Sequence, residues 1–311
     1  MTGQVLTWTV RDDTMREREA LGSVLSFEFD LHLMAAGGNV GDGRLVVSAA
    51  DPALAHLIDL SDPADARACG GVVCRRRDGA RIAVVASGVV TEVDIDADAG
   101  IATIAWVPDD AITAAERAWT DPTADIPTGS AVGTVAEYDT RTGSAGAVAA
   151  AYVAANIGPA AGVAWRRYPW LTVPTPASLA GVGSTGTWQA RDEALLDVLT
   201  RVASGTGIVW GFAQASESTV AMTVRAPSAT PAARFSTVAR TVTGSHLVLA
   251  RRTADTVIAG GGGDGVDRVR TRKVGHAVPA GSYRAVQWVQ GPSGEYADLQ
   301  QAAAEYLASD D

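Results

Sequence analysis

Cysteine and histidine are both scarce in this sequence. It has only two cysteines, Cys69 and Cys74, in 311 residues, too few for a disulfide framework or for a tetrahedral zinc site of their own. A local bridge is compatible with their spacing, but we favour two small buried thiols. The four histidines are His32, His56, His246 and His276. They lie far apart and match no metalloprotease spacing, so we expect no metal and no cofactor.

Positive charge and long apolar runs are also lacking. The chain has 25 Lys and Arg against 35 Asp and Glu, a formal net charge of -10. This balance argues against a general nucleic-acid binder, because such proteins neutralise phosphates with basic patches. It suits either simple solubility or a surface that DNA must pass without sticking. No run of about eighteen apolar residues occurs, so we expect no membrane span, and residues 1–5 lack a secretion-signal pattern.

Strand patterns dominate what the sequence does contain. Residues 23–33 alternate between apolar and polar side chains, which predicts a strand with one face on a core. Its apolar positions are Leu25, Phe27, Phe29, Leu31 and Leu33. Residues 72–87 form a predicted hairpin around Gly79, and residues 89–107 form a second around a turn at 96–100. Consecutive antiparallel hairpins usually close into a barrel or sandwich to hide their edges.

The chain therefore divides into three expected parts. Residues 1–109 form a first β-barrel, residues 110–227 a small α+β insert with two helices, and residues 228–311 a second β-barrel with a terminal helix. The fold class is β-rich α+β, with two antiparallel β-barrels flanking the insert. The terminal helix reaches Asp310-Asp311 without a cap, which is compatible with a native chain that continues.

The expected elements of the last two parts follow from periodicity and from turn residues. Asp109-Asp110 is predicted to cap the first helix, and Gly158 and Pro159 to end the second. A first helix is expected at 111–119, and the two packed helices of the insert at 147–156 and 192–203, with strands at 170–173, 208–213 and 219–225. The last part is expected to hold strands at 241–242, 246–250, 255–259, 266–273 and 283–289 and a helix at 297–309.

Three short patterns look like ligand sites, but each lacks an essential element. The glycine run at 260–265 is followed by a predicted strand, whereas a phosphate loop needs a helix N-terminus there, so we interpret it as a wide hairpin loop. Asp94, Asp96 and Asp98 lack the register of a calcium loop and are interpreted as solvated turn residues. Ser184 lies among glycines without the spacing of a nucleophile elbow.

Charged residues also suggest no reaction site. Glu28 falls on the polar phase of its strand, and Glu193 falls in a first helical turn, where the helix dipole favours it. The basic spots at 75–77 and 251–252 are interpreted as ordinary surface charge or as contacts between subunits. We therefore single out no catalytic, cofactor-binding or metal-ligating residue, and we expect no enzyme.

A series of segments, in a fixed order along the chain, carries a family resemblance. The central block is the most specific: 138–143 (Tyr-Asp-Thr-Arg-Thr-Gly), 152–161 (Tyr-Val-Ala-Ala-Asn-Ile-Gly-Pro-Ala-Ala) and 166–167 (Arg-Arg). Further matching segments are 27–31, 71–79, 87–89, 108–110, 115–117, 195–199, 225–227 and 257–265. In these segments the sequence resembles the hub-like minor tail proteins of siphophages that infect actinobacteria, a family related to the baseplate hubs of contractile-tailed phages.

The resemblance implies a structural protein at the tail tip of a virion, assembled in the cytoplasm of the host bacterium. It implies a homotrimer built from tail-tube-like β-barrels, which closes the tail tube and joins it to receptor-binding and penetration parts. The implied partners are the ring of distal tail or tail-tube protein, the tape measure protein and the tail fibres, while DNA passes through without specific binding. No catalytic position carries over from the family.

Two other functions stay open on the residues alone. A tail-associated peptidoglycan hydrolase would need a cleft with paired carboxylates or a metal site. A carbohydrate-binding receptor module would need exposed tryptophans in a groove. We expect Trp8, Trp106 and Trp170 to belong to the core instead.

Overall fold

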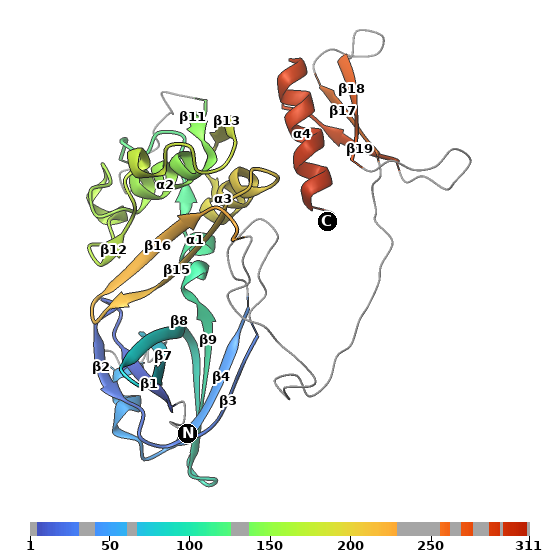
Figure 1. Cartoon of the computed structure of the whole chain (residues 1–311). Coiled ribbons are helices and arrows are strands. Elements are labelled where there is room, and N and C mark those ends of the chain that lie inside the picture. The colour runs from blue at the N-terminus through green and yellow to red at the C-terminus, as the bar shows by residue number, and fades with distance from the viewer. Residues whose placement is uncertain are drawn as a thin grey trace. The chain divides into compact units, whose positions relative to one another are not determined.

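The computed structural model describes residues 5–30, 41–60, 67–125, 137–228, 256–261, 269–275, 286–292 and 295–309. Contacts divide the chain into two units, residues 1–225 and residues 226–311. Unit 1 holds a large sheet and an α+β part, and unit 2 holds a small sheet with one helix (Figure 1). This content confirms the predicted β-rich α+β class, while the three-domain division stays a prediction.

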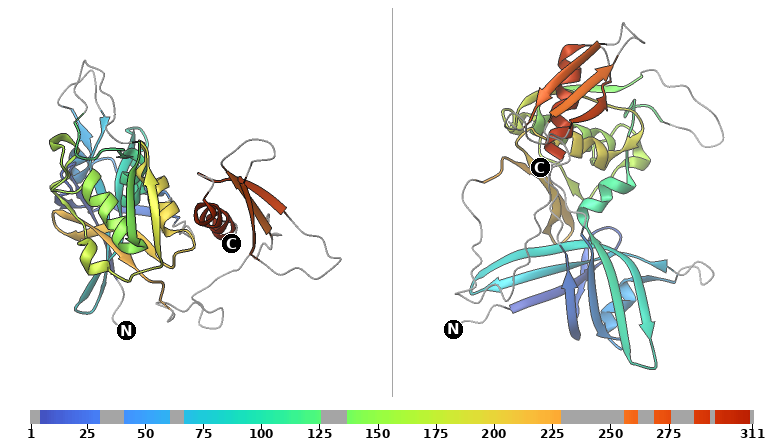
Figure 2. Two further views of the ribbon diagram at one scale, coloured as in Figure 1. Left: turned by 90° about the horizontal axis from the view of Figure 1, so that it is seen from above. Right: turned by 90° about the vertical axis from the view of Figure 1, so that its right-hand side faces the viewer.

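The N-terminal part of unit 1 is one seven-stranded antiparallel sheet that curls around a core (Figure 2). In spatial order its strands are β2 (Glu17–Ala20), β1 (Val5–Arg11), β7 (Gly71–Asp78), β8 (Arg81–Asp96), β9 (Ile101–Pro108), β4 (Gly43–Ser48) and β3 (Val24–Phe29). Trp8, Leu45, Ile104 and Trp106 are buried inside it. Among the described residues no ladder joins the outer strands β2 and β3, so closure into a barrel stays a prediction.

A short helix and a two-residue ladder complete this part. The helix is η1 (Pro52–His56), and the side chain of Asp51 accepts a hydrogen bond from the backbone nitrogen of Ala53 at its first turn. The sequence Asp51-Pro52 predicts the start of this helix, but the expected end at Leu60 is wrong, because the helix stops at His56 and residues 58–59 form strand β5. The small ladder joins β5 (Ile58–Asp59) to β6 (Arg67–Ala68).

The two predicted hairpins are present, but they share one long strand. They turn at Gly79 and Gly100, whose φ angles are +60° and +70°. The expected break at Gly88 is wrong, since β8 runs through it as a single strand of 16 residues. A Cβ atom at Gly88 would lie 2.2 Å from the carbonyl oxygen of Val107 and 2.4 Å from the Trp106 ring. Glycine therefore serves here to let β8 pass close to β9, without a turn.

A bulge in β3 breaks the predicted alternation. Val24 pairs with Val47 and Ser26 pairs with Val46, so Leu25 is the extra residue. Leu25 is 63% exposed. After the bulge, Phe27 and Phe29 lie on the inner face, where both rings contact Trp8. Positions 31 and 33 of the predicted alternation lie outside the described residues.

The α+β part of unit 1 packs two helices against short ladders (Figure 1). Its helices are η2 (Asp109–Ala111), α1 (Ile112–Ala115), α2 (Ala145–Asn156), η3 (Ala164–Arg166), η4 (Pro176–Leu179) and α3 (Leu195–Ala203). Its strands are β10 (Arg117–Ala118), β11 (Asp139–Ser144), β12 (Leu171–Thr172), β13 (Thr185–Ala190), β14 (Glu193–Ala194), β15 (Val209–Ser216) and β16 (Thr219–Arg225). The alanine-rich α2 is buried along most of its length and contacts α3.

Two predicted helices are shorter than expected because a long-range ladder takes their ends. The helix expected at 111–119 stops at Ala115, and Glu116 is extended, with φ -104° and ψ 160°. The carbonyl oxygen of Glu116 accepts a hydrogen bond from the backbone nitrogen of Leu195 at 2.9 Å, and β10 pairs with β14 beside it. The helix expected from residue 192 therefore begins only at Leu195.

Unit 2 is a three-stranded sheet with one helix on it. Its elements are β17 (Thr256–Gly261), β18 (Val269–Val274), β19 (Val286–Gln290) and α4 (Tyr296–Ser309). Leu299, Ala303 and Leu307 of α4 form its core with Val257 and Ala259. The strands expected at 241–250 lie outside the described residues.

The sequence predicts an antiparallel sheet in unit 2, but the sheet is mixed. β17 pairs antiparallel with β18 on one edge and parallel with β19 on the other. The parallel ladder arises because β19 lies beside β17, whereas a simple meander would place it beside β18. Its closure into a second barrel stays a prediction.

Candidate functional site

A buried polar junction connects the seven-stranded sheet to the α+β part. The side chain of Arg11, at the end of β1, is fully buried and forms an ion pair with Asp109 of η2. Its Nη1 atom also donates to Oε1 of Gln214 on β15 at 2.5 Å. Asp109 Oδ2 accepts a further hydrogen bond from Ser87 Oγ of β8 at 2.5 Å. One cluster thus links four elements that lie up to 203 residues apart in sequence.

The neighbours of this cluster complete the junction. The backbone nitrogen of Gln214 donates to Ser87 Oγ at 2.9 Å, and the backbone nitrogen of Phe212 donates to Asp110 Oδ1 at 2.6 Å. Gln214 Nε2 donates to the carbonyl oxygen of Met15 at 2.8 Å. Buried polar networks of this kind hold a single arrangement, because every alternative leaves a charge unpaired.

The predicted capping role of Asp109-Asp110 is wrong. The N-cap residue of η2 is Pro108, and no side chain caps this helix. Both aspartates lie in its first turn, and their carboxylates bind residues of β1, β8 and β15 instead. The local pattern was found, but its partners lie too far away in sequence to be inferred.

The central motif of the family resemblance forms a second junction, inside the α+β part. Tyr152 of α2 is fully buried, and its hydroxyl lies 2.8 Å from the carbonyl oxygen of Asp139 and 2.9 Å from that of Trp188. Burial raises the pKa of the Tyr152 hydroxyl well above its usual range. Asn156, one turn later, accepts a hydrogen bond from the backbone nitrogen of Trp119 at 2.9 Å. The motif therefore fixes α2 to the β11–β13 ladder, which is a structural task.

Arg166, which also belongs to the central motif, is 2% exposed. Its guanidinium lies 4.3 Å from the ring centroid of Trp119 and 4.9 Å from that of Trp165. Cation–π contacts of this kind replace the missing solvation of a buried arginine. The arginine thereby supports the turn after α2.

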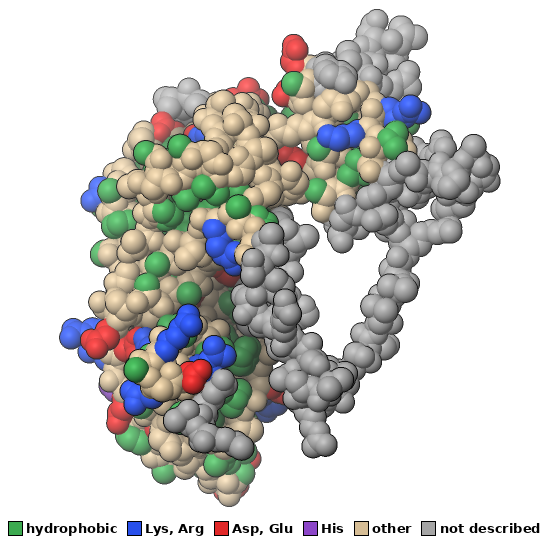
Figure 3. Space-filling view, viewed as in Figure 1, with side chains coloured by type: hydrophobic (Ala, Val, Ile, Leu, Met, Phe, Trp, Pro, Cys, Tyr) green, Lys and Arg blue, Asp and Glu red, His purple; other side chains and the backbone are tan. Residues whose placement is uncertain are grey.

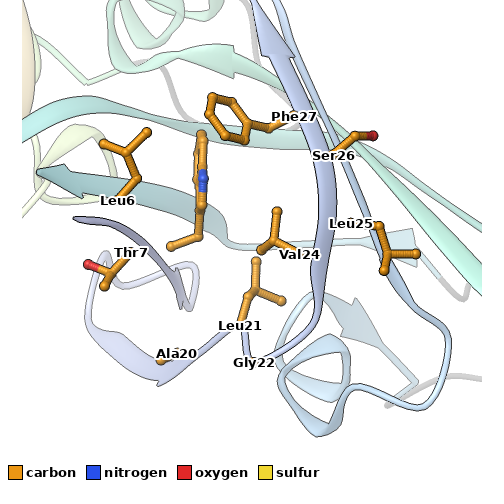
Figure 4. Close-up of a pocket in the computed structure, with 10 residues that line it drawn as sticks. Leu6, Thr7, Ala20, Leu21, Gly22, Val24, Leu25, Ser26 and Phe27 are labelled. Carbon is orange, nitrogen blue, oxygen red and sulfur yellow. The ribbon is translucent and has the colours of Figure 1, made fainter. Parts of the chain in front are cut away.

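An apolar opening of about 600 Å³ lies between β1, β2 and β3, where the sheet has its two outer edges (Figure 4). All ten residues around it are uncharged: Leu6, Thr7, Trp8, Ala20, Leu21, Gly22, Val24, Leu25, Ser26 and Phe27. Trp8 and Phe27 are both among these residues, and their ring centroids lie 5.6 Å apart. Phe27 is 42% exposed although it faces inward, so the apolar interior of the sheet reaches the surface here.

In the described part of the chain, the histidines and aspartates that the sequence offered as ligand candidates do not come together at either junction or at the apolar opening. His56 is exposed, 3.7 Å from Glu19, while the other three histidines lie outside the described residues. Asp94, Asp96 and Asp98 are exposed at the β8–β9 turn, where Asp96 Oδ1 accepts a bond from the backbone nitrogen of Ala99 at 2.8 Å. Across the described ranges no group of three or more His, Cys, Asp or Glu could hold a metal ion.

The cysteines and the glycine run have structural positions. Cys69 and Cys74 are free thiols, of which Cys74 is buried as expected, whereas Cys69 is only partly buried. Burial raises the pKa of Cys74 to about 11. Gly260 and Gly261 end β17, and the next strand β18 is antiparallel to it. A strand therefore follows the run, as predicted, although residues 262–268 lie outside the described part.

The remaining candidates are surface residues or belong to the core. Ser184 lies just before β13 and is exposed. Glu193, expected in a first helical turn, lies in strand β14 instead, before α3 begins at Leu195, and forms an ion pair with Arg201 at 2.7 Å. Trp8 and Trp106 are buried as predicted, whereas Trp170 is only partly buried against the core. In the part of the chain that the structure describes, no helix is long and apolar enough to cross a membrane.

Comparisons with known proteins place the chain among phage proteins. The sequence model of a family described as siphovirus ReqiPepy6 Gp37-like protein matches residues 7–309. No curated protein matches the chain. It is similar to the crystal structure of the tail protein from Neisseria meningitidis MC58, with a TM-score of 0.44 and 14% identity over 96% of this chain and 74% of that chain. It is also similar to the 43 kDa tail protein of prophage MuSo2 from Shewanella oneidensis, with a TM-score of 0.41 and 13% identity over 96% and 75%.

Proposed function

The chain belongs to the family of siphovirus ReqiPepy6 Gp37-like proteins, and from that premise we propose that it is a structural hub at the tip of a phage tail. The membership confirms the resemblance to siphophage tail proteins that the sequence motifs indicated. The observation that carries the proposal is the extent of the match, which runs from residue 7 to residue 309 and so includes both units.

The hub closes the end of the tail tube and joins it to receptor-binding and penetration parts. Its partners are two further copies in a homotrimer, the distal tail or tail-tube ring, the tape measure protein and the tail fibres. If each copy holds the two β-barrels that the family resemblance implies, three copies present pseudo-sixfold symmetry to a hexameric ring. The rigid junction at Arg11 and Asp109 suits such a role, because it fixes the first sheet relative to the α+β part.

The net charge of -10 supports an electronegative inner face. Such a face repels DNA phosphates and lets DNA pass during ejection. In this proposal the protein is a component of the virion at the tail tip, and it is assembled there in the cytoplasm of the host.

The buried carboxylates of unit 1 favour this structural role over wall hydrolysis. Three buried carboxylates occur among the described residues, Asp51, Asp109 and Asp110. Asp51 accepts bonds from Gly22, Ser23 and Ala53, and the other two bind the junction. A glycosidase needs one buried acid that is free to transfer its proton. None of these three is free, because each holds parts of the fold together.

Labelling of virions tests the location. A phage carrying this chain with an epitope tag is incubated with gold-labelled antibody and imaged by electron microscopy. We expect gold at the tail end distal to the capsid, and none on untagged virions. Gold along the tail shaft, at the capsid, or only on unassembled protein would contradict the proposal. A zymogram with the purified chain gives the independent test of the hydrolase alternative, for which we expect no cleared zone.

A further inference from the structure

Two groups of like charge lie at opposite ends of strand β8. The arginine end consists of Arg76, Arg77 and Arg81 at the β7–β8 turn, and the acidic end consists of Glu92, Asp94, Asp96 and Asp98 at the β8–β9 turn. All seven side chains are exposed. None forms an ion pair with a described residue. The arginine end contains a single acid, Asp78, in a chain whose net charge is -10.

The two ends are far apart on one molecule. β8 is 16 residues long, and an extended strand of that length spans at most roughly 50 Å. The strand bends across the sheet, and its two turns point away from each other (Figure 2). On the face shown in Figure 3, several Lys and Arg side chains lie over the seven-stranded sheet, with Asp and Glu side chains among them. One copy therefore cannot neutralise its own arginine end with its acidic end.

Each charged end also carries exposed apolar side chains. Val5 and Ile82, both 53% exposed, are cross-strand neighbours of Arg77. Leu6, which lines the apolar opening, is the cross-strand partner of Arg76. At the other end, Ile95 is 45% exposed between Asp94 and Asp96. Each end thus combines uncompensated charge with apolar area, the composition expected of a contact surface.

The two outer strands of the sheet, β2 and β3, differ in the charge that they carry. β2 is short, and its Glu17 pairs with Arg75, which protects that edge. β3 has six residues, and its sequence Val-Leu-Ser-Phe-Glu-Phe has a single charge. Leu25, at the bulge, and Phe27 are exposed on this strand and line the apolar opening.

We propose that copies of this chain associate head to tail, with the arginine end and the adjoining apolar opening of one copy against the acidic end of the next. Opposite charges meet there, and the contact removes the repulsion within each group. The side chain of Ile95 faces the apolar opening of the neighbouring copy. Because the two surfaces differ, the contact is heterologous and closes into a ring when the rotation between copies allows it. The inference rests on the proposed self-association of the hub and identifies the surfaces that make it.

Charge exchange tests the contact. One variant carries Arg76→Glu, Arg77→Glu and Arg81→Glu, and a second carries Asp94→Lys, Asp96→Lys and Asp98→Lys. A third variant carries all six changes. Sedimentation velocity measures the oligomers of each purified full chain, and circular dichroism melting shows whether each one folds. A matched control changes two other exposed arginines, Arg117→Glu and Arg225→Glu, away from both ends.

We expect the native chain and the control to form a closed oligomer, and each three-residue variant to associate at least tenfold more weakly. The six-residue variant should recover the native oligomer, because its exchanged ends attract each other again. An equal mixture of the two three-residue variants can only alternate, so it should form even-numbered species in place of a trimer. Raising the salt from 0.05 to 0.5 M should weaken the native contact, because it shortens the screening length.

The outcomes separate this inference from the hub proposal. A native oligomer that survives in both three-residue variants, or no recovery in the six-residue variant, overturns the inference but leaves the hub proposal intact. A native chain that stays monomeric at all concentrations also overturns it, whereas gold labelling of virions tests the hub independently. If the arginine variant forms normal oligomers but is lost from virions, the arginine end binds another acidic tail protein and the inference is wrong.

Discussion

The two sides of the seven-stranded sheet are built in opposite ways. On the side of the α+β part, Arg11 and Asp109 bind each other, and Ser87 and Gln214 bind them in turn, so that only Nε of the Arg11 guanidinium has no partner among the described residues. On the other side, between β1 and β3, apolar side chains such as Phe27 are exposed around an opening. The first side is closed by contacts within one chain, and the second is open in the part of the chain that the structure describes. The sheet is therefore fixed on the side of the junction and open to contact on the side of the apolar opening.

The largest expected effect comes from breaking the ion pair between Arg11 and Asp109. Arg11→Ala leaves Asp109 buried without its counterion, and we expect a loss of about 3–5 kcal/mol in the free energy of unfolding. Urea denaturation of the purified chain, followed by circular dichroism, measures it. The double variant Arg11→Met with Asp109→Leu removes both charges and should recover most of the loss. If Arg11→Ala unfolds at the native urea midpoint, the junction does not hold the fold.

A matched pair of aromatic side chains compares the closed and open regions directly. Trp106 is 1% exposed and Phe27 is 42% exposed, so we expect Trp106→Ala to cost about 3–5 kcal/mol and Phe27→Ala about 1 kcal/mol. The same denaturation experiment measures both. Equal losses would show that Phe27 is as well packed as Trp106, contrary to an open edge.

A pair of glycines tests the close approach of strands near the junction. A Cβ atom at Gly71 would lie 2.3 Å from the carbonyl oxygen of Gly88 and 2.5 Å from Arg11 Nε, so Gly71→Ala should cost about 3 kcal/mol. Gly79, at φ +60°, has open space around it, so Gly79→Ala should cost only about 1–2 kcal/mol through backbone strain. Thermal melting compares the two variants. The reverse order would mean that backbone strain outweighs crowding here.

The smallest effect concerns alkaline pH. Burial raises the pKa of Tyr152 and of Tyr168, the latter also through its hydrogen bond to Glu116. Both stay protonated in the native state when the unfolded chain begins to ionise at a pKa of about 10. The native chain therefore binds more protons, and its stability should fall above pH 10 by up to about 1.4 kcal/mol per pH unit for each tyrosine. Tyr152→Phe should flatten that slope, and an unchanged slope in urea titrations would contradict the assignment.

The hairpins and helix α2 could be predicted from the sequence because turn residues next to them in the chain determine where they end. The hairpins were found because Gly79 and the turn ending at Gly100 stand between alternating segments, and helix α2 was found because Gly158 and Pro159 follow it. The bulge at Leu25 and the end of α1 at Ala115 were missed. Each depends on a partner strand more than 20 residues away, which periodicity does not report.

The junction could not be predicted for the same reason. Arg11 and Asp109 are 98 residues apart, and neither has an unusual local context except that two acids stand together after a strand. For the opening beside β3 the sequence held only a weak indication, which is an apolar strand with a single charge. Only the order of strands in the sheet shows that this strand is an outer one.

The length of β8 has a mechanical consequence. Its first half pairs with β7 and its second half with β9, and Ser87, near its middle, binds Asp109. A pull on either turn therefore acts along the strand and loads many ladder hydrogen bonds in shear, so that they must fail together. Tension applied at the β7–β8 or the β8–β9 turn would therefore reach Ser87 and the buried junction through one continuous strand.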